Sequence, residues 1–460
     1  MTEIRVFNPA NPTELVWSGA ATTPAELVEM TRASRVAQKA WGRLDGRARH
    51  TQIAAFLDAV QARREALAER MVLEQGKLQG EALGEVTKSL VEARWMLGRC
   101  LESTGTIMAS ARPNMRAMRV KRPRGVVLAI TPWNFPVLTP MRKIVPALVF
   151  GNAILVKPAS DAPGTALLLQ EAARETLPEG LVLVVLGGAQ VAGAAITSVD
   201  VDAVTFTGST DTGKKVMALA AEGLKEVSLE LGGKNPAILH DPFDLEDALD
   251  HVVRAAFANG GQRCTAISRV LVHENLRNAA TAGLISRISA LRPGAGAEAG
   301  ATLAALSNRA QFDRVCTFVK DLDPTETNVL TGGSVADRPG GGYFFEPTLV
   351  EVIDPQSKIN FEEVFGPVLG LEFYSNINDA IKRANAPEYG LTASVFGTDI
   401  QALRQFEEEI EAGMIHVNHG TFPDENMPFG GWKASGVGAP SVGQDADQFF
   451  TRIQAVYEGV

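Results

Sequence analysis

One cysteine of this 460-residue chain lies where it can act as a nucleophile. Cys264 ends the run NGGQRC (259–264), which follows a helical pattern and precedes a strand-like one. A cysteine after a Gly-Gly turn can expose its sulfur, and a thiol is a good nucleophile even when only a few per cent of it is ionised at pH 7. The competing interpretation is a small buried apolar side chain, the usual role of a free cysteine.

A carboxylate is the second candidate for chemistry. Glu230 lies in LELGGKN (229–235), and its neighbours Leu229, Leu231 and Gly232 predict partial burial. Burial raises the pKa of a carboxyl group and can make it a general base near neutral pH. The alternative is a structural carboxylate that pairs with Lys234 or with a backbone amide.

An amide in a rigid turn is the third candidate. Asn134 lies in ITPWNFP (130–136), where two prolines and two aromatic residues restrict the backbone. An amide N–H held there can stabilise a developing oxyanion. The alternative is a turn asparagine that bonds its own backbone.

Two segments have the composition of a nucleotide site. FTGSTDTGKKV (206–216) follows an apolar run, and Gly208 lets a phosphate approach the backbone while Ser209 or Thr210 can cap the helix that begins there. LVKPAS (155–160) ends another predicted parallel strand, where Lys157 can reach ribose hydroxyls. An ordinary strand-to-helix turn and a surface lysine are the alternatives. EEVFGPV (362–368) and PFGGWKASG (428–436) are further loops, and each either contributes to a binding site or only connects two elements of the fold.

The elements that must position these residues alternate along the chain. Residues 24–104 have helical periodicity, and short apolar runs separated by helical stretches follow from 153 to 240. This alternation predicts a doubly wound α/β domain with a parallel sheet. A second alternating region, from about 245 to 430, predicts a second α/β domain. The strand-like tail can pair with another subunit.

Composition excludes several classes of protein. The net charge is −9 with acids and bases interspersed, so we expect neither a nucleic acid nor a membrane surface as a partner. Three cysteines and six histidines, without ligand spacing, predict no disulfide framework and no metal site. The N-terminal residues do not resemble a signal peptide and no apolar run approaches about 20 residues. We therefore expect a cytoplasmic protein.

Together these segments resemble the aldehyde dehydrogenase superfamily. The motifs ITPWNFP, VKPAS, FTGST, LELGGKN, GQRC, EEVFGPV and PFGGWKASG occur in the family's order and at its approximate spacing, across nearly the whole chain. The resemblance implies a Rossmann-like cofactor domain (1–105 and 122–231), an α/β catalytic domain (232–430) and a β oligomerisation flap (106–121 and 440–460). It also implies a homodimer or homotetramer.

The resemblance implies a role for each matching residue. Cys264 matches the nucleophile, Glu230 the base that activates water, and Asn134 the oxyanion donor. The implied reaction oxidises an aldehyde through a thioester on Cys264, which water then hydrolyses. The residues matching the cofactor site are Thr131, Trp133, Lys157, Ser160, Gly208, Ser209, Glu363 and Phe365.

One departure bears on the cofactor, which the resemblance implies to be NAD or NADP. Many NAD-preferring members carry a glutamate three residues after the lysine, and this chain has Ser160. Two like charges about 4 Å apart repel by about 4 kcal/mol at an effective dielectric of about 20. The missing carboxylate therefore predicts that NADP is accepted and favoured. The alternative is that Ser160 caps the next helix and both cofactors bind.

The substrate is suggested by Arg142, which matches an arginine that binds the far carboxylate in succinate-semialdehyde dehydrogenases. A guanidinium suits a carboxylate. Against this, a second arginine of that branch is replaced by Ala258, and Pro423-Asp424 replaces a serine-bearing loop. GQRCTAISR is also similar to the α-ketoglutaric semialdehyde branch. We expect an ω-carboxylated semialdehyde such as succinate semialdehyde. The alternatives are a simple aliphatic or aromatic aldehyde, with Arg142 in a salt bridge.

Two further functions compete with hydrolytic oxidation. A CoA-acylating semialdehyde dehydrogenase would also use Cys264, but members of that branch often lack the glutamate, and Glu230 is present. A non-catalytic structural protein on this fold is disfavoured because every catalytic residue type is present.

Overall fold

The first large sheet provides one side of the molecule. The computed structural model describes residues 2–338 and 340–459. Strands β5 to β9 are parallel in the order β9-β8-β5-β6-β7, with β19 added antiparallel beside β9. Their bounds are β5 (Val126–Ile130), β6 (Ala153–Lys157), β7 (Val182–Val184), β8 (Ala203–Thr207), β9 (Glu226–Glu230) and β19 (Gly436–Val437). All residues of β5 and β6 are buried, as expected for strands covered on both faces.

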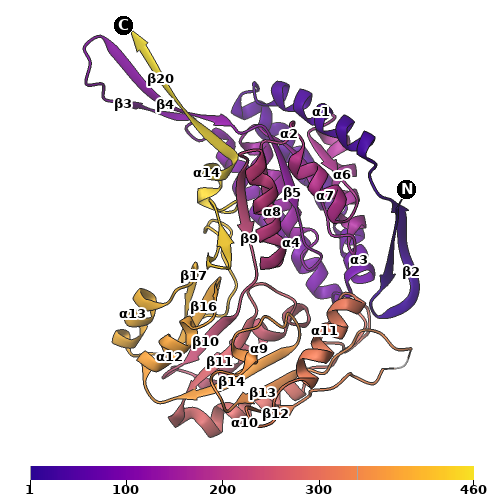
Figure 1. Cartoon of the computed structure of the whole chain (residues 1–460), viewed down its shortest axis with the longest axis vertical. Helices are drawn as coiled ribbons and strands as arrows, with labels where there is room; N and C mark the ends of the chain where they lie inside the picture. Colours follow the sequence, from indigo (N-terminus) through magenta and orange to yellow (C-terminus); the bar gives the residue numbers. More distant parts are fainter. Residues whose placement is uncertain (1, 339, 460) are drawn as a thin grey trace.

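Helices cover both faces of this sheet, so the predicted doubly wound domain is confirmed (Figure 1). One face carries α5 (Leu138–Val149) and α6 (Pro163–Thr176), with α2 (Gly46–Ala62), α3 (Arg64–Gln75) and α4 (Gln79–Gly98) packed around them. The other carries α1 (Pro24–Trp41), α7 (Ala189–Thr197) and α8 (Thr210–Glu222). The chain runs from β5 through β6 to β7 at one edge and then crosses back to β8 on the other side of β5, so the strand order reverses between β5 and β8. Such a switch point is where open α/β sheets bind ligands.

The second large sheet has the order β12-β13-β14-β11-β10-β16-β17, parallel except for β12. The bounds are β10 (Asn235–Leu239), β11 (Ile267–His273), β12 (Thr327–Thr331), β13 (Thr348–Val352), β14 (Val368–Tyr374), β16 (Thr392–Phe396) and β17 (Met414–Val417). Apolar residues of α9 (Leu245–Phe257) and α10 (Arg277–Ser289) pack on one face, and those of α12 (Ile377–Asn385) and α13 (Ile400–Glu409) on the other. Helix α11 (Arg309–Lys320) packs separately against β13 and β14.

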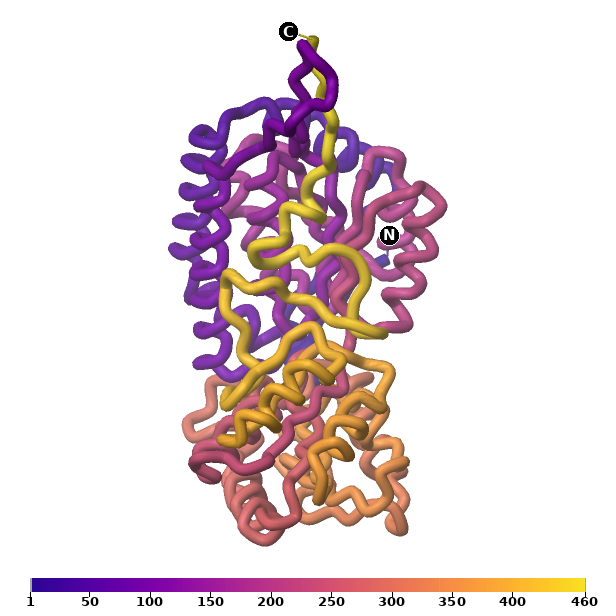
Figure 2. The backbone as a smooth tube through the Cα atoms, turned by 90° about the vertical axis from the view of Figure 1, so that its left-hand side faces the viewer, coloured from indigo at the N-terminus to yellow at the C-terminus, as the bar shows by residue number. Residues whose placement is uncertain are grey.

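The two sheets are joined at two places. Strand β9 ends at Glu230 and β10 begins at Asn235, so the chain passes between the domains in four residues. The C-terminal segment then crosses back after β17, which Figure 2 shows as the yellow tube running from the lower domain to the upper one. On its way it forms β18 (Trp432–Lys433), paired with β15 (Tyr389–Gly390), and then β19.

Two smaller β elements lie outside these domains. The hairpin of β1 (Glu3–Asn8) and β2 (Asn11–Ala20) contacts α3. A three-stranded flap of β3 (Gly105–Met108), β4 (Met115–Pro123) and β20 (Thr451–Gly459) projects from the body at the top of Figure 1. Strand β20 pairs with β4 along its full length, from Thr451 opposite Pro123 to Gly459 opposite Met115. Residues just before β20 belong to the body, since Phe449 and Phe450 are fully buried in the first domain's core.

Among the described helices, none combines the length and apolar character needed to cross a lipid bilayer.

Candidate active site

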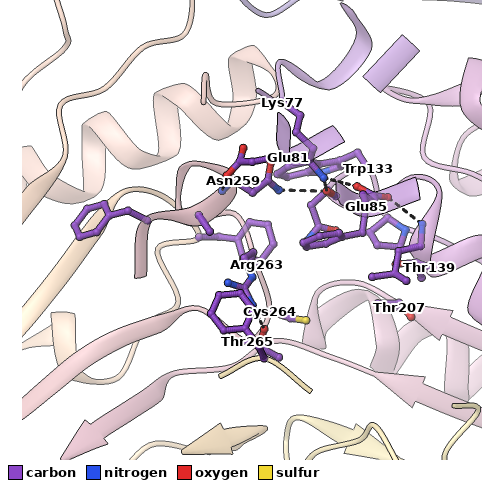
Figure 3. A pocket seen from close by; sticks show the side chains of 18 of the residues that line it. Lys77, Glu81, Glu85, Trp133, Thr139, Thr207, Asn259, Arg263, Cys264 and Thr265 are labelled. Carbon is purple, nitrogen blue, oxygen red and sulfur yellow. Dashed lines mark hydrogen bonds and ion pairs between the residues drawn. The ribbon is translucent and has the colours of Figure 1, made fainter. Parts of the chain in front are cut away.

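A cavity of about 860 Å³ lies where the carboxyl ends of β5, β8 and β9 face the second domain. Cys264, Glu230 and Asn134 all line it, although Glu230 lies 34 positions and Asn134 130 positions before Cys264 in the chain. Lining residues also come from α4 and α9, so both domains build its walls. Figure 3 shows the Cys264 sulfur turned toward the interior of this cavity.

A tight turn after α9 places the nucleophile candidate. Asn259, Gly260 and Gly261 have φ values of 56°, 63° and 71°, a left-handed conformation that favours glycine. A Cβ at Gly261 would lie 2.2 Å from the Gly366 carbonyl oxygen, so this position requires glycine. Asn259 tolerates its strained backbone because its N–H donates to Glu81 at 2.7 Å and its side chain is bonded on both sides, to Gln75 and to the Asn134 carbonyl.

The Cys264 thiol is protonated in the free protein at neutral pH. Burial, helped by the carboxylates of Glu230 and Glu363 and opposed by the Arg263 guanidinium, raises its pKa to about 11. A nucleophilic thiolate therefore requires a change in this environment, and the cationic nicotinamide ring of an NAD-type cofactor is one charge that could supply it.

Asn134 is held by a buried ion pair that sequence analysis missed. Lys77 Nζ donates to the Asn134 carbonyl at 2.9 Å and pairs with Glu85, whose other oxygen accepts the N–H groups of Val137 and Leu138 at 2.8 and 2.9 Å. Lys77 precedes α4 and Glu85 lies within it, eight positions further on, so no local helical spacing signals the pair. The Asn134 amide Nδ2 donates to the Gln262 carbonyl at 2.8 Å, beside Cys264 in sequence.

Glu230 has different partners from those expected. Its Oε1 accepts from Lys143, in a buried ion pair, and from Ser441 Oγ at 2.8 Å, while Oε2 accepts from Thr207 at 3.0 Å. Burial raises the pKa of this carboxyl, but the Lys143 charge and these bonds outweigh burial and hold the pKa below its usual value. The prediction that burial would leave it raised is therefore wrong, because the sequence did not reveal the buried cation.

Lys234, the partner considered for Glu230, lies elsewhere. Its ammonium is buried and finds no hydrogen-bond partner among the described residues. Burial and the nearby Arg269 lower its pKa to about 7.

The cofactor candidates form two groups. Trp133, Gly208, Ser209, Glu363 and Phe365 line the same cavity as Cys264. The Trp133 and Phe365 rings meet edge to face at 5.6 Å, and Glu363 Oε1 accepts the Gly233 N–H at 2.9 Å. Burial raises the pKa of the Glu363 carboxyl.

The second group lies at the ends of β5 and β6, outside the cavity lining. Lys157 is buried and its Nζ donates to the Pro158 carbonyl at 3.0 Å, while the Lys157 carbonyl accepts the Thr131 N–H at 3.1 Å. Ser160 Oγ donates to the Gly187 carbonyl at 3.4 Å and does not cap α6, whose cap residue is Ala162.

The start of α8 differs from one expectation. Ser209 occupies the cap position, but its Oγ bonds Thr212 Oγ1 at 3.0 Å and no side chain satisfies the first backbone amides. Free amides at a helix N-terminus favour an anion. A Cβ at Gly208 would lie 2.5 Å from the Phe206 ring, so glycine keeps this turn open.

Arg142 lines the cavity, yet most of its guanidinium is occupied. Nε and Nη2 donate to the two oxygens of Glu92 at 2.6 and 2.8 Å, a bidentate pair that is nearly buried. Its guanidinium also lies 4.8 Å from the Phe429 ring centre. The salt-bridge alternative for Arg142 is thus present, and only Nη1 has no hydrogen-bond partner among the described residues.

Comparison with known proteins places this architecture in a family. The aldehyde dehydrogenase family model matches residues 1–456. The chain is 32% identical to the alpha-ketoglutaric semialdehyde dehydrogenase of Bacillus subtilis over 99% of this chain and 94% of that protein. It is 34% identical to the NADP(+) succinate-semialdehyde dehydrogenase of Escherichia coli over 95% of this chain and 90% of that protein. The betaine aldehyde dehydrogenase of Staphylococcus aureus, solved with NAD+, superposes with a TM-score of 0.96 at 29% identity, covering 100% of this chain and 92% of that one. The chain belongs to the aldehyde dehydrogenase family and is an oxidoreductase that acts on aldehydes.

Proposed function

We propose that this protein oxidises an ω-carboxylated semialdehyde to the corresponding acid with NAD or NADP as hydride acceptor. The observation that carries the proposal is the meeting of Cys264, Asn134 and Glu230 in one cavity that also reaches the start of α8. Semialdehyde dehydrogenases are among its relatives, including those of Bacillus subtilis and Escherichia coli.

The cofactor has a fitting site. The unsatisfied amides at the start of α8, with Gly208 before them, suit a pyrophosphate, and Glu363 offers a carboxylate to ribose hydroxyls. Bound NAD or NADP would accept a hydride from the substrate. Lys157 at the end of β6 is the candidate for the adenosine ribose.

The first half-reaction uses Cys264 and Asn134. The thiolate attacks the aldehyde carbon, and the carbonyl π electrons move to oxygen. The resulting oxyanion accepts hydrogen bonds from Asn134 Nδ2 and the Cys264 amide. Asn134 Nδ2 carries two hydrogens and donates one to Gln262, so the other is free for the substrate. When the oxyanion collapses, the C–H electron pair leaves with its hydrogen to the acceptor and a thioester remains on Cys264.

The second half-reaction uses Glu230. Water attacks the thioester carbon, Glu230 takes one water proton, and the acid leaves as the Cys264 sulfur recovers its electron pair. We assign the base to Oε2, because Oε1 already accepts from both Lys143 and Ser441 while Oε2 accepts only from Thr207. The lowered pKa keeps Glu230 ionised, as a base must be. Its presence favours hydrolysis over transfer to CoA.

Cations support a carboxylated substrate. Lys88 and Arg263 are among the cationic side chains that line the cavity. A panel of semialdehydes and simple aldehydes, followed by NAD(P)H absorbance, tests the proposal. We expect succinate semialdehyde to exceed butanal in kcat/KM by at least tenfold. Higher kcat/KM for butanal would favour the simple-aldehyde alternative, and a CoA thioester product would favour the acylating one.

For the cofactor, we propose that NADP is favoured over NAD. Ser160 is neutral, so it does not repel a 2′-phosphate as the glutamate common at this position would. Nearby Asp161 accepts from Asn308 at 2.9 Å, and burial raises its pKa. Measuring kcat/KM with each cofactor tests this, and a large preference for NAD would refute it. Ser160→Glu is the matched variant, expected to weaken NADP use more than NAD use.

We also propose a homodimer or homotetramer assembled through the flap. Ile107, Met108, Ile453 and Tyr457 are exposed apolar side chains on its strands. Light scattering of the full chain and of Ile453→Glu measures this. We expect the variant to shift toward smaller species, and a monomeric wild type would contradict the proposal.

A further inference from the structure

Arg263, which directly precedes the nucleophile, has an unused hydrogen-bond donor. Its Nη2 donates to Thr265 Oγ1 and to the Thr421 carbonyl, both at 3.2 Å. Its guanidinium stacks on the Phe422 ring at 4.3 Å. Nη1 is buried and has no hydrogen-bond partner among the described residues. A buried N–H group without an acceptor is costly, and a charged one more so, so such a group calls for a ligand or a bound water.

The charge of Arg263 is also uncompensated. Within the part of the chain that the structure describes, no carboxylate lies within ion-pair distance of Arg263. Burial, with a smaller contribution from Arg254, lowers its pKa to about 10, although Cys264 and the more distant Glu81 favour the charged form. The guanidinium still carries its charge at neutral pH. Removing a buried cation from water without a partner costs several kcal/mol, and an incoming anion would offset this cost.

Arg142 provides the contrast. Both residues line the same cavity, but Arg142 already holds the two oxygens of Glu92. A substrate carboxylate at Arg142 would meet the Glu92 carboxylate beside it and share one cation with it. At Arg263 it would meet no such competitor.

The surroundings hold Arg263 in place for binding. Thr421 and Phe422 belong to the loop before the PFGG motif, and the next carbonyl, of Pro423, accepts from Lys88 Nζ at 2.7 Å. The loop is therefore fixed to α4 on one side and to Arg263 on the other. A donor that is already oriented loses little conformational entropy when it binds an anion.

We propose that Arg263 binds the far carboxylate of the substrate and is the residue that selects carboxylated over uncharged aldehydes. This inference rests on the proposed semialdehyde function and replaces the role that the sequence resemblance suggests for Arg142.

A second role for Arg263 must be separated from this one. Its positive charge also lowers the pKa of the Cys264 thiol, so removing it affects every aldehyde through the nucleophile. An anchor acts on carboxylated substrates alone. The ratio of kcat/KM for succinate semialdehyde to that for butanal cancels the common effect on the thiol.

The experiment compares Arg263→Met with Arg142→Met and with Arg254→Met in the full chain. Arg254 is the matched control, since its guanidinium lies over the same Phe422 ring at 5.1 Å but is exposed. In Arg263→Met we expect this ratio of kcat/KM values to fall by about 10- to 100-fold, chiefly because KM for succinate semialdehyde rises. A change of this size corresponds to the loss of one charge-assisted hydrogen bond. Arg142→Met and Arg254→Met should change it by less than about threefold, and Arg263→Lys should recover part of it.

Product inhibition gives a readout that does not depend on turnover of the acid semialdehyde. Succinate should inhibit butanal oxidation by the wild type, and its inhibition constant should rise at least tenfold in Arg263→Met. Equal losses for both aldehydes, or a ratio lost in Arg142→Met instead, would overturn the assignment. A wild type that oxidises butanal without inhibition by succinate also overturns it. A wild type that oxidises no aldehyde with either cofactor would instead refute the proposed function.

Discussion

The two walls of the cavity differ in how completely their charges are paired. We call the side built by α4, α5 and β9 the cofactor-side wall, and the side built by Arg263 and Cys264 the catalytic-side wall. On the first, Lys143 pairs with Glu230 and Lys77 with Glu85. On the second, Arg263 Nη1 is buried and has no hydrogen-bond partner among the described residues.

The difference separates groups whose buried charges are already paired within the protein from groups that gain a partner only when a ligand binds. Paired buried charges keep fixed positions and need no rearrangement during a reaction, which suits an oxyanion loop and a base. Unpaired buried groups gain most when a ligand arrives. The proposed nucleophile, Cys264, belongs to the second kind, because its raised pKa disfavours the thiolate until its surroundings change.

The largest expected effect comes from removing the base on the cofactor-side wall. Glu230→Gln keeps the size of the side chain and its bond to Ser441 but cannot take a proton from water. We expect kcat to fall by about 10²- to 10⁴-fold because thioester hydrolysis becomes limiting, while hydride transfer continues. Rapid mixing should therefore show a burst of NAD(P)H close to one per active site, followed by a slow phase.

Added hydroxylamine provides the control for that variant. It attacks the thioester without needing a base, so it should restore turnover in Glu230→Gln and affect the wild type little. A variant with no burst would mean that Glu230 acts before the thioester forms, against the proposed division of roles.

Loss of the oxyanion donor should come next in size. Asn134→Ala removes Nδ2 but leaves the backbone carbonyl that Lys77 and Asn259 hold, so the loop keeps its anchors. We expect kcat to fall by about 10²- to 10³-fold, with the burst slowed as well, because the oxyanion forms before hydride transfer. Stopped-flow absorbance measures both phases. A slow steady state behind a normal burst would contradict this role.

The parts of this site that the sequence predicted are those whose signal is local. The left-handed turn before Cys264 requires Gly261, and the turn around Asn134 is fixed by its prolines and aromatics, so both could be inferred from short segments. Strand and helix alternation likewise predicted the parallel sheets, because burial on both faces leaves continuous apolar runs.

What the sequence did not reveal is pairing over long separations. Ser441 meets Glu230 across 211 positions, and Lys143 meets it across 87. No local pattern shows that Glu92 pairs with Arg142 while Arg263 Nη1 has no hydrogen-bond partner among the described residues. The direction of the Glu230 pKa was misjudged for the same reason, since burial was inferable and its compensating cation was not.

A stability measurement sharpens the comparison at Arg142. Glu92→Gln replaces a bidentate carboxylate by an amide that can accept one of the two bonds. We expect the free energy of unfolding to fall by about 1–3 kcal/mol, read from urea denaturation. Glu65→Gln is the matched control, because Glu65 forms a mostly exposed pair with Arg64 and should cost less than about 0.5 kcal/mol. Equal losses of unfolding free energy in both variants would mean that the pair of Glu92 and Arg142 stabilises the protein no more than a surface ion pair does.

The smallest expected effect is on the pH dependence of Cys264 alkylation, which shows how charged groups on the two walls change the pKa of the thiol. Only the thiolate reacts with iodoacetamide, so in the cofactor-free protein the alkylation rate of Cys264 should rise about tenfold per pH unit and level off near pH 11. The Glu230 carboxylate disfavours a second negative charge and so raises the thiol pKa. Glu230→Gln should therefore move the profile to lower pH. Arg263→Met should move it to higher pH, because the guanidinium that favours the thiolate is lost. If the two variants moved the profile in the same direction, the charges of the two walls would not be acting on Cys264 in opposition, and burial alone would set its reactivity.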